Sequence, residues 1–207
     1  YRLSDVIKAL NEPTVKESKA VYRTRRNGKI TYEDYLEIPE EPGYQYELLE
    51  GNLIMEPSPA VIHQRVSRKL QRILEDYFNK TDPAGEVFDA PLDVTLSDIT
   101  VVQPDILYIA GNQREIIKEM RIDGPPRLVA EILSPYNSRK DRIQKMEIYR
   151  KAGVQHYWLV DPDEKTLECF KLCDGFYAFV TAGMEEDILE HPDFKDLSIP
   201  LNNLWYN

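Results

Sequence analysis

Residues 127–153 read RLVAEILSPYNSRKDRIQKMEIYRKAG, and they carry the strongest structural signal in the chain. The first seven are mostly apolar, with Glu131 in their middle, which is typical of a buried strand. Pro135 ends the strand, and a helix is expected from 138 to about 152. Gly153 closes that helix, because glycine readily adopts the left-handed conformation that follows a helix. A strand followed directly by a helix indicates a mixed α/β domain.

Two carboxylates resist a purely structural explanation. Glu131 interrupts the most apolar strand, and Asp105 follows Pro104 within the β-rich run 101–107. Carboxylates are rarely buried unless they are paired or bind a cation. Two such acids on neighbouring strands therefore suggest a divalent-metal site. The alternative is that each acid lies at an exposed strand end or caps a backbone amide.

The helix after Glu131 adds a third group. Asp141, Lys145 and Tyr149 are spaced by four residues, so they share one helix face, and Lys145 can reach back over the acids. Two acids that hold Mg²⁺ (or Mn²⁺) beside an ammonium group suit phosphodiester hydrolysis. The alternative for Lys145 is a surface salt bridge to Asp141.

The rest of the chain adds helices and strands in an irregular order. A capping-box spacing from Thr31 to Asp34 predicts a short helix over about 32–37. Apolar residues at helical spacing predict an amphipathic helix over about 60–79, and the turn Gly51-Asn52 predicts a tight hairpin. The remaining expected strands are 86–96, 101–109, 155–160, 167–172 and 176–181.

Length and composition indicate one globular domain. The chain has 207 residues, of which 42% are hydrophobic, so it can bury a substantial core. We interpret residues 1–30 as an N-terminal extension and residues 31–207 as a single domain. We expect no membrane span, because no apolar run is long enough. We also expect a cytoplasmic location, with Cys169 and Cys173 as reduced thiols.

The net charge of −10 argues at first against a nucleic-acid substrate, because phosphate contacts depend on Lys and Arg. The excess acid is concentrated in residues 33–56 and 185–196, however, whereas 60–80 and 136–153 are basic. A solvated helix face is the plainer interpretation of each basic segment. As contacts to nucleic acid, the candidates are Arg65, Arg68, Arg72, Arg139, Lys140 and Arg142.

Two further features have competing interpretations. His63 begins the basic helix, where we expect a capping hydrogen bond, with phosphate contact as the alternative. Tyr157 and Trp158 are expected in the strand core, with a stacking platform for bases as the alternative.

Several short motifs, in order, resemble the Uma2 (DUF820) family, a bacterial and notably cyanobacterial branch of the PD-(D/E)xK restriction-endonuclease-like superfamily. The resemblance covers about residues 31–172. It rests on these pieces: TYEDYL (31–36), YELLEG (46–51), SP (58–59), HQ (63–64), PD (104–105), AEILSP (130–135), Asp141, Lys145, Tyr149, AGV (152–154) and YWLVDP (157–162).

The resemblance implies an α/β fold with a restriction-endonuclease-like core, a mixed sheet flanked by helices, and a Mg²⁺-dependent endonuclease acting on DNA, or else RNA. Asp105 and Glu131 match the two metal-binding acids of the family. Glu47 matches an upstream acid that would complete the metal site, and the carbonyl of Ile132 matches a further ligand position. A homodimer is also expected, because many proteins of this fold dimerise.

One position departs from the superfamily pattern. The lysine expected two residues after the second acid is Leu133 here. We expect Lys145, on the following helix, to supply the ammonium instead. The same departure keeps a rival hypothesis open: a catalytically silent nucleic-acid-binding or protein-interaction module on a nuclease fold.

Overall fold

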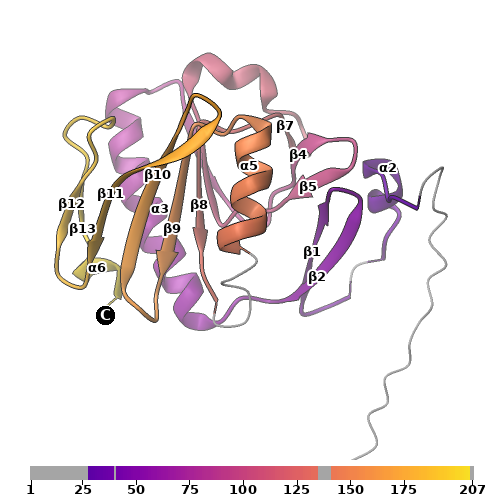
Figure 1. Cartoon of the computed structure of the whole chain (residues 1–207), viewed down its shortest axis with the longest axis horizontal. Helices are drawn as coiled ribbons and strands as arrows, with labels where there is room; N and C mark the ends of the chain where they lie inside the picture. Colours follow the sequence, from indigo (N-terminus) through magenta and orange to yellow (C-terminus); the bar gives the residue numbers. More distant parts are fainter. Residues whose placement is uncertain (1–27, 40, 135–140, 206–207) are drawn as a thin grey trace, which may run out of the picture.

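The computed structural model describes residues 28–39, 41–134 and 141–205. It is a mixed α+β fold in which helices flank two β-sheets (Figure 1). The predictions for residues 1–27, Arg139 and Lys140 lie outside the described residues. Over the described ranges, no helix combines the length and the apolar character needed to cross a membrane.

The larger sheet has six strands in the order β11-β10-β9-β8-β6-β3. β8 and β9 are parallel, and the other neighbours are antiparallel. The strands are β3 (Glu86–Asp89), β6 (Ile106–Ile109), β8 (Leu128–Ile132), β9 (His156–Asp161), β10 (Thr166–Cys173) and β11 (Phe176–Met184). The expected strands at 127–133, 155–160, 167–172 and 176–181 are therefore confirmed.

The second sheet has five strands in the order β2-β1-β5-β4-β7. These strands are β1 (Tyr44–Leu49), β2 (Asn52–Pro57), β4 (Val94–Ser97), β5 (Thr100–Val102) and β7 (Ile122–Asp123). The expected hairpin is present, but its turn is Glu50-Gly51 rather than Gly51-Asn52. Both turn residues have positive φ (51° and 85°), and Leu49 pairs with Asn52, as in a two-residue hairpin loop.

The prediction of two long strands at 86–96 and 101–109 is wrong, because each run divides into two strands that belong to different sheets. The first run breaks at Ala90-Pro91 and the second at Gln103-Pro104, where proline cannot donate a ladder hydrogen bond. The consequence for function is that Asp105 lies where the chain crosses from the five-stranded to the six-stranded sheet.

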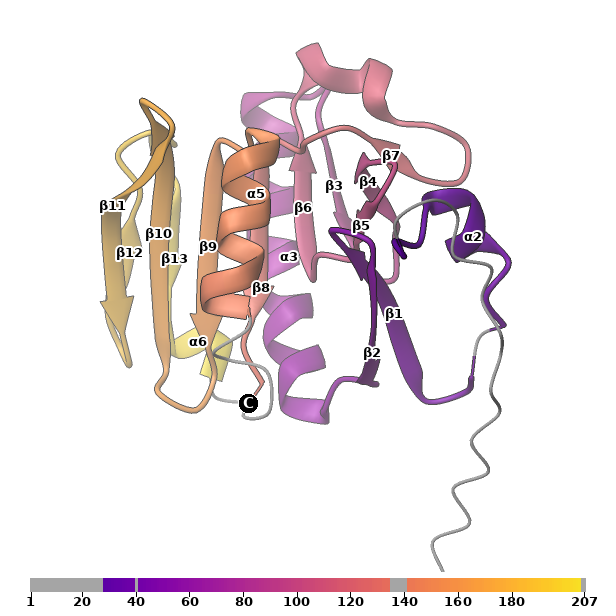
Figure 2. The ribbon, with the colours of Figure 1, turned by 45° about the vertical axis from the view of Figure 1, so that its right-hand side comes forward.

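Helices cover both faces of the six-stranded sheet (Figures 1 and 2). Along β8, Leu128, Ala130 and Ile132 join the core that contains α3 (Val61–Thr81). Val129 joins the core that contains α5 (Met146–Ala152). Because side chains alternate along a strand, Glu131 faces the α5 side with Val129.

Of the remaining helices before the C-terminal region, two agree with the expected ranges, and the third, a 3₁₀ helix, has no counterpart among the predictions. α2 (Tyr32–Leu36) has the predicted Thr31–Asp34 capping box. The described part of the helix expected over 138–152 starts as a π-helix, η2 (Asp141–Lys145), and continues as α5, with Gly153 at φ 88°. A 3₁₀ helix, η1, spans Gly111–Ile116.

The sequence patterns predict no helix or strand in the C-terminal region. It forms β12 (Ile188–Glu190), β13 (Ser198–Pro200) and α6 (Asn202–Trp205). Leu204 and Trp205 pack into the core on the α3 side of the six-stranded sheet. The C-terminal segment therefore covers that face of the sheet together with α3.

Candidate active site

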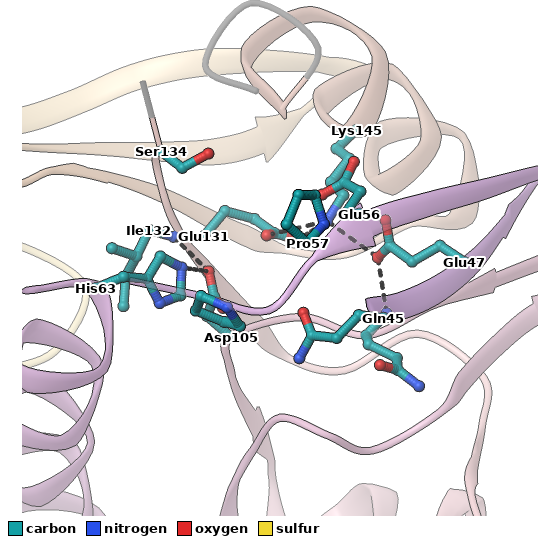
Figure 3. Close-up of a pocket in the computed structure, with 12 residues that line it drawn as sticks. Gln45, Glu47, Glu56, Pro57, His63, Asp105, Glu131, Ile132, Ser134 and Lys145 are labelled. Atoms are coloured by element: carbon teal, nitrogen blue, oxygen red, sulfur yellow. Dashed lines mark hydrogen bonds and ion pairs between the residues drawn. The ribbon is translucent and has the colours of Figure 1, made fainter. Parts of the chain in front are cut away.

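A cavity of about 60 Å³ lies where the two sheets meet (Figure 3). Acidic, amide and imidazole side chains, one lysine and two prolines surround it; we call it the acid cavity. Its lining residues are Gln45, Glu47, Glu56, Pro57, Pro59, His63, Gln103, Asp105, Glu131, Ile132, Ser134 and Lys145. The structure thus brings the three predicted acids and the predicted lysine to one place.

Glu131 is 3% exposed and has two strong donors on the α5 side. Lys145 Nζ lies 3.3 Å from its Oε1 and 3.2 Å from its Oε2, and the Tyr149 hydroxyl donates to Oε1 at 2.5 Å. Lys145 and Tyr149 therefore share a helix face, as their spacing predicted. Charge-assisted hydrogen bonds of this kind fix the orientation of a carboxylate.

Tyr149 remains a hydrogen-bond donor over a wide pH range. Burial of its phenol, together with the negative charge of the nearby Glu131 and Glu47 carboxylates, raises the pKa of Tyr149 well above its usual value. Loss of its proton would place a third negative charge among two carboxylates, which a dry site disfavours. Its role at Glu131 is thus that of a neutral donor.

Glu47 reaches the cavity from β1 and shares the lysine. Its Oε1 lies 3.0 Å from Lys145 Nζ and accepts a 2.9 Å hydrogen bond from the backbone N–H of Gln103. The other oxygen, Oε2, is buried and has no hydrogen-bond partner among the described residues. An orphaned buried carboxylate oxygen is costly unless a water or an ion satisfies it.

Asp105 is held at the crossover between the sheets. Its Oδ2 accepts a 2.7 Å hydrogen bond from the backbone N–H of Ile132 and lies 3.1 Å from His63 Nε2. His63 was expected to cap α3, which is wrong: Ala60 is the N-cap residue and makes no side-chain capping bond. A signal was present, since His63 lies at helical spacing from the buried Val66, on the inward face of α3.

The charges around the cavity do not balance. Four carboxylates line it, and Lys145 is the one permanently cationic side chain among the described lining residues. Two of the four carboxylates, Glu47 and Glu131, are at most 5% exposed, as is Lys145, so water screens the charges of these three groups little. Hard carboxylate oxygens, one of them orphaned, fit a Mg²⁺-type cation that also keeps water ligands.

Leu133, which stands where the superfamily pattern has a lysine, does not line the acid cavity, and Lys145 supplies the ammonium instead. Leu133 is 7% exposed and packs into the core beneath α5, whereas Lys145 at the end of η2 contacts both Glu131 and Glu47. Ile132 lines the cavity and donates its N–H to Asp105. The metal-ligand role of its carbonyl stays a prediction.

Three of the six predicted nucleic-acid contacts lie outside the cavity. Arg65, Arg68 and Arg72 are exposed on α3 and do not line it. Arg142 lies in η2, but the structure does not describe the placement of its side chain. Tyr157 and Trp158 are fully buried, which confirms them as core and excludes them as a stacking platform.

A second cluster of ligand-type groups lies elsewhere. Ligand atoms of His156, His191 and Asp193 lie within 4.8 Å of one another, and burial lowers the pKa of each histidine to about 4. His191 Nδ1 accepts the Asp193 N–H at 3.1 Å, so its Nε2 carries the proton in the neutral ring. The Asp193 carboxylate already pairs with Lys171 at 2.9 Å. Because His191 Nε2 carries a proton and the Asp193 carboxylate is paired with Lys171, this cluster is a poorer cation site than the acid cavity.

Comparison with known proteins gives a family match over most of the chain. The model of the Uma2 family, described as "Putative restriction endonuclease", matches residues 32–202. That match extends thirty residues beyond the resemblance found in the motifs, through β12 and β13.

Two individual proteins are also similar. A crystal structure described as "a putative nuclease belonging to DUF820", from Anabaena variabilis, superimposes with a TM-score of 0.68 at 23% identity, over 85% of this chain and 97% of that one. Protein sll1609 of Synechocystis sp. is 25% identical over 134 residues, which are 64% of this chain and 75% of that protein. The structural similarity confirms the nuclease-type fold.

Proposed function

From the premise that this chain belongs to the Uma2 family, we propose that it is a metal-dependent endonuclease that hydrolyses phosphodiester bonds of DNA. The acid cavity is its active site. Asp105, Glu131 and Glu47 hold a divalent cation of the Mg²⁺ or Mn²⁺ type, and Lys145 acts on the phosphate.

One observation carries the proposal: buried acids from two sheets converge on a cavity whose described lining includes a single lysine, and Glu47 Oε2 has no hydrogen-bond partner among the described residues. A purely structural ion pair would balance its charges and satisfy its oxygens. An excess of buried negative charge is instead what a cation site needs before the cation binds.

Each residue has a separate task. The Lys145 ammonium, held between two carboxylates, neutralises charge that develops on the phosphate in the transition state. Tyr149 keeps Glu131 oriented, and His63 and the Ile132 N–H keep Asp105 oriented. A bound divalent cation would supply Lewis-acid stabilisation of the phosphate oxygens. The exposed arginines of α3 lie outside the cavity and would contact the phosphate backbone.

The test is conversion of supercoiled plasmid to the nicked form with Mg²⁺ or with EDTA. We expect nicking with Mg²⁺ and its loss in Asp105→Ala and Glu131→Ala. The matched control is Asp98→Ala, which removes an exposed acid outside the cavity. Absence of metal-dependent nicking, with oligonucleotide binding retained, would replace this proposal with the silent binding module. A preference for RNA cleavage would correct the substrate.

A further inference from the structure

A second pocket, of about 390 Å³, adjoins the acid cavity. Three tyrosines dominate its wall, and we call it the tyrosine pocket. Its lining residues are Tyr35, Leu36, Ile38, Tyr44, Gln45, Tyr46, Ser58, Pro91, Asp93 and Gln103. Gln45 and Gln103 also line the acid cavity, so the two hollows share part of their walls.

The alternation of β1 accounts for this arrangement. Gln45 and Glu47 point to one face of the strand, and Tyr44 and Tyr46 point to the other. β1 therefore presents a carboxylate to the acid cavity and aromatic rings to the tyrosine pocket. Gln45, near the start of the strand, contributes to both hollows.

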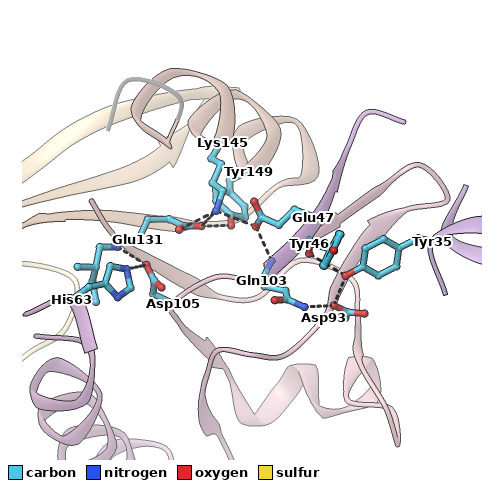
Figure 4. A network of polar contacts seen from close by, with 11 residues as sticks. Tyr35, Tyr46, Glu47, His63, Asp93, Gln103, Asp105, Glu131, Lys145 and Tyr149 are labelled. Carbon is cyan, nitrogen blue, oxygen red and sulfur yellow. Dashed lines mark hydrogen bonds and ion pairs between the residues drawn. The ribbon is translucent and has the colours of Figure 1, made fainter. Parts of the chain in front are cut away.

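Hydrogen bonds hold the far wall of the tyrosine pocket in place (Figure 4). The Tyr35 hydroxyl contacts the Tyr46 carbonyl at 3.0 Å and Asp93 Oδ1 at 3.2 Å. Gln103 donates its side-chain amide to Asp93 at 2.9 Å and its backbone N–H to Glu47 at 2.9 Å. Gln103 thus links the pocket wall directly to the acid cavity.

Two groups remain available to a ligand. Tyr44 is 44% exposed, so a ligand can reach it from solvent. The amide of Gln45 makes no hydrogen bond to any described residue. An accessible aromatic ring stacks on a nucleobase, and an amide can both donate to and accept from the edge of that base.

We propose that the tyrosine pocket binds one unpaired nucleobase of the strand whose phosphodiester bond lies in the acid cavity. Tyr44 stacks on the base, and Gln45 contacts its edge. In a nucleotide, base and phosphate are joined through a single sugar, which matches two hollows that share lining residues. This inference rests on the proposed function, because it takes the acid cavity to be the place of the phosphate.

The substrate class follows from the pocket. A base that is stacked and paired inside a duplex cannot enter, unless it is extruded at a cost of a few kcal/mol. The protein therefore prefers single-stranded or locally unpaired DNA to a perfect duplex.

The experiment measures binding rather than cleavage. A fluorescein-labelled 12-nucleotide DNA, the same strand annealed to its complement, and a 12-unit strand without bases are titrated by fluorescence anisotropy. Ca²⁺ replaces Mg²⁺ as the hard cation. We expect the single strand to bind at least tenfold more tightly than either the duplex or the baseless strand. An RNA 12-mer of the same sequence tests the nature of the sugar.

Variants assign that base dependence to the pocket. Tyr44→Ala should weaken binding of the normal strand by about 5- to 150-fold, the loss typical of one stacked base, and leave the baseless strand unaffected. Gln45→Ala should weaken it in the same direction. Phe179→Ala is the matched control, because Phe179 is an exposed aromatic residue on β11, 61% exposed. Melting curves by circular dichroism check that each variant folds.

The outcomes separate this inference from the proposed function. Equal binding of normal and baseless strands, no binding at all, or full binding by both pocket variants would overturn the base site, even if Asp105→Ala abolishes nicking. Base-dependent binding that Tyr44→Ala removes, in a protein that cuts no DNA, would keep the base site and reject the nuclease.

Discussion

Lys145 Nζ lies 3.2 Å from Glu131 Oε2, although fourteen residues separate the two in sequence. Both side chains are almost fully buried, at 5% and 4% exposed. The free-energy cost of removing two charges from water offsets most of the attraction between them. Such a pair contributes little to stability by itself, and its position beside Glu47 and Asp105 is better explained by chemistry than by folding.

Lys145→Met should destabilise the metal-free protein by about 3–5 kcal/mol, because Glu131 and Glu47 would stay buried without their cation. Added Mg²⁺ should recover part of that loss, since a ligand that binds only the folded state stabilises it. Urea unfolding with and without Mg²⁺ measures both effects. Lys151→Met is the control: Lys151 pairs with Glu50 at 2.9 Å but is half exposed, so its loss should cost under about 1 kcal/mol. Equal losses in the two variants would contradict the account.

Tyr149→Phe removes one donor to Glu131 and keeps the aromatic ring. We expect a loss of about 1–3 kcal/mol in unfolding free energy, because a buried acceptor loses a charge-assisted bond, together with a cleavage rate lowered tenfold or more. Tyr177→Phe also removes a hydrogen bond, to the Val154 carbonyl at 2.8 Å, but away from the cavity. That variant should lose stability and keep its cleavage rate. If both variants cleave equally, Tyr149 has no orienting role.

His63→Ala tests the support of Asp105. Partners that orient a metal ligand typically contribute 10- to 100-fold to metal affinity or activity, so we expect a loss of that size in the apparent Mg²⁺ affinity of cleavage. Gln64→Ala changes the neighbouring, exposed residue and should have no effect. An unchanged Mg²⁺ affinity in His63→Ala would show that Ile132 alone holds Asp105.

How much of this site the sequence could predict depends on the type of residue. Glu131 and Asp105 stand out because an acid within an apolar run of sequence violates the usual pattern of burial. Helical spacing predicts that Lys145 lies on the helix face that reaches back over the acids, and its contact with Glu131 agrees with that prediction. Gln103 has no such signal, because a glutamine before a proline is ordinary in a loop, and its bonds join β1 to residues distant in sequence.

The fold shows the same limit. β-rich composition predicts where a strand run lies but not where it changes sheet, so it does not reveal the breaks at Ala90-Pro91 and Gln103-Pro104. Residues 185–196 are strongly acidic and show no pattern typical of a strand, yet β12 forms there and buries Leu189. β13 and α6 are too short, at three and four residues, to show a period, and Leu204 and Trp205 join the core through tertiary packing.

Stability should fall as the pH drops from about 6.5 towards 4. Burial lowers the pKa of His156 and of His191 to about 4, so below the unfolded value of 6.5 the unfolded chain binds more protons and is favoured. Each histidine contributes on the order of 3 kcal/mol, which is fully present above pH 6.5. Urea titrations at pH 7.5, 6 and 5 measure the slope. His191→Asn should make it shallower; an unchanged slope would exclude His191 as a source.

The central claim is that Asp105, Glu131 and Lys145 form one cation-dependent phosphodiesterase centre. The most direct measurement is the rate of cleavage of a single-stranded DNA circle as the Mg²⁺ concentration is raised, in the native chain, Glu131→Gln and Lys145→Met. We predict a saturable rise in the native chain, no cleavage in Glu131→Gln, and in Lys145→Met a rate at least a hundredfold lower with Mg²⁺ still bound. Cleavage that persists in EDTA, or that survives in Glu131→Gln, would contradict the claim.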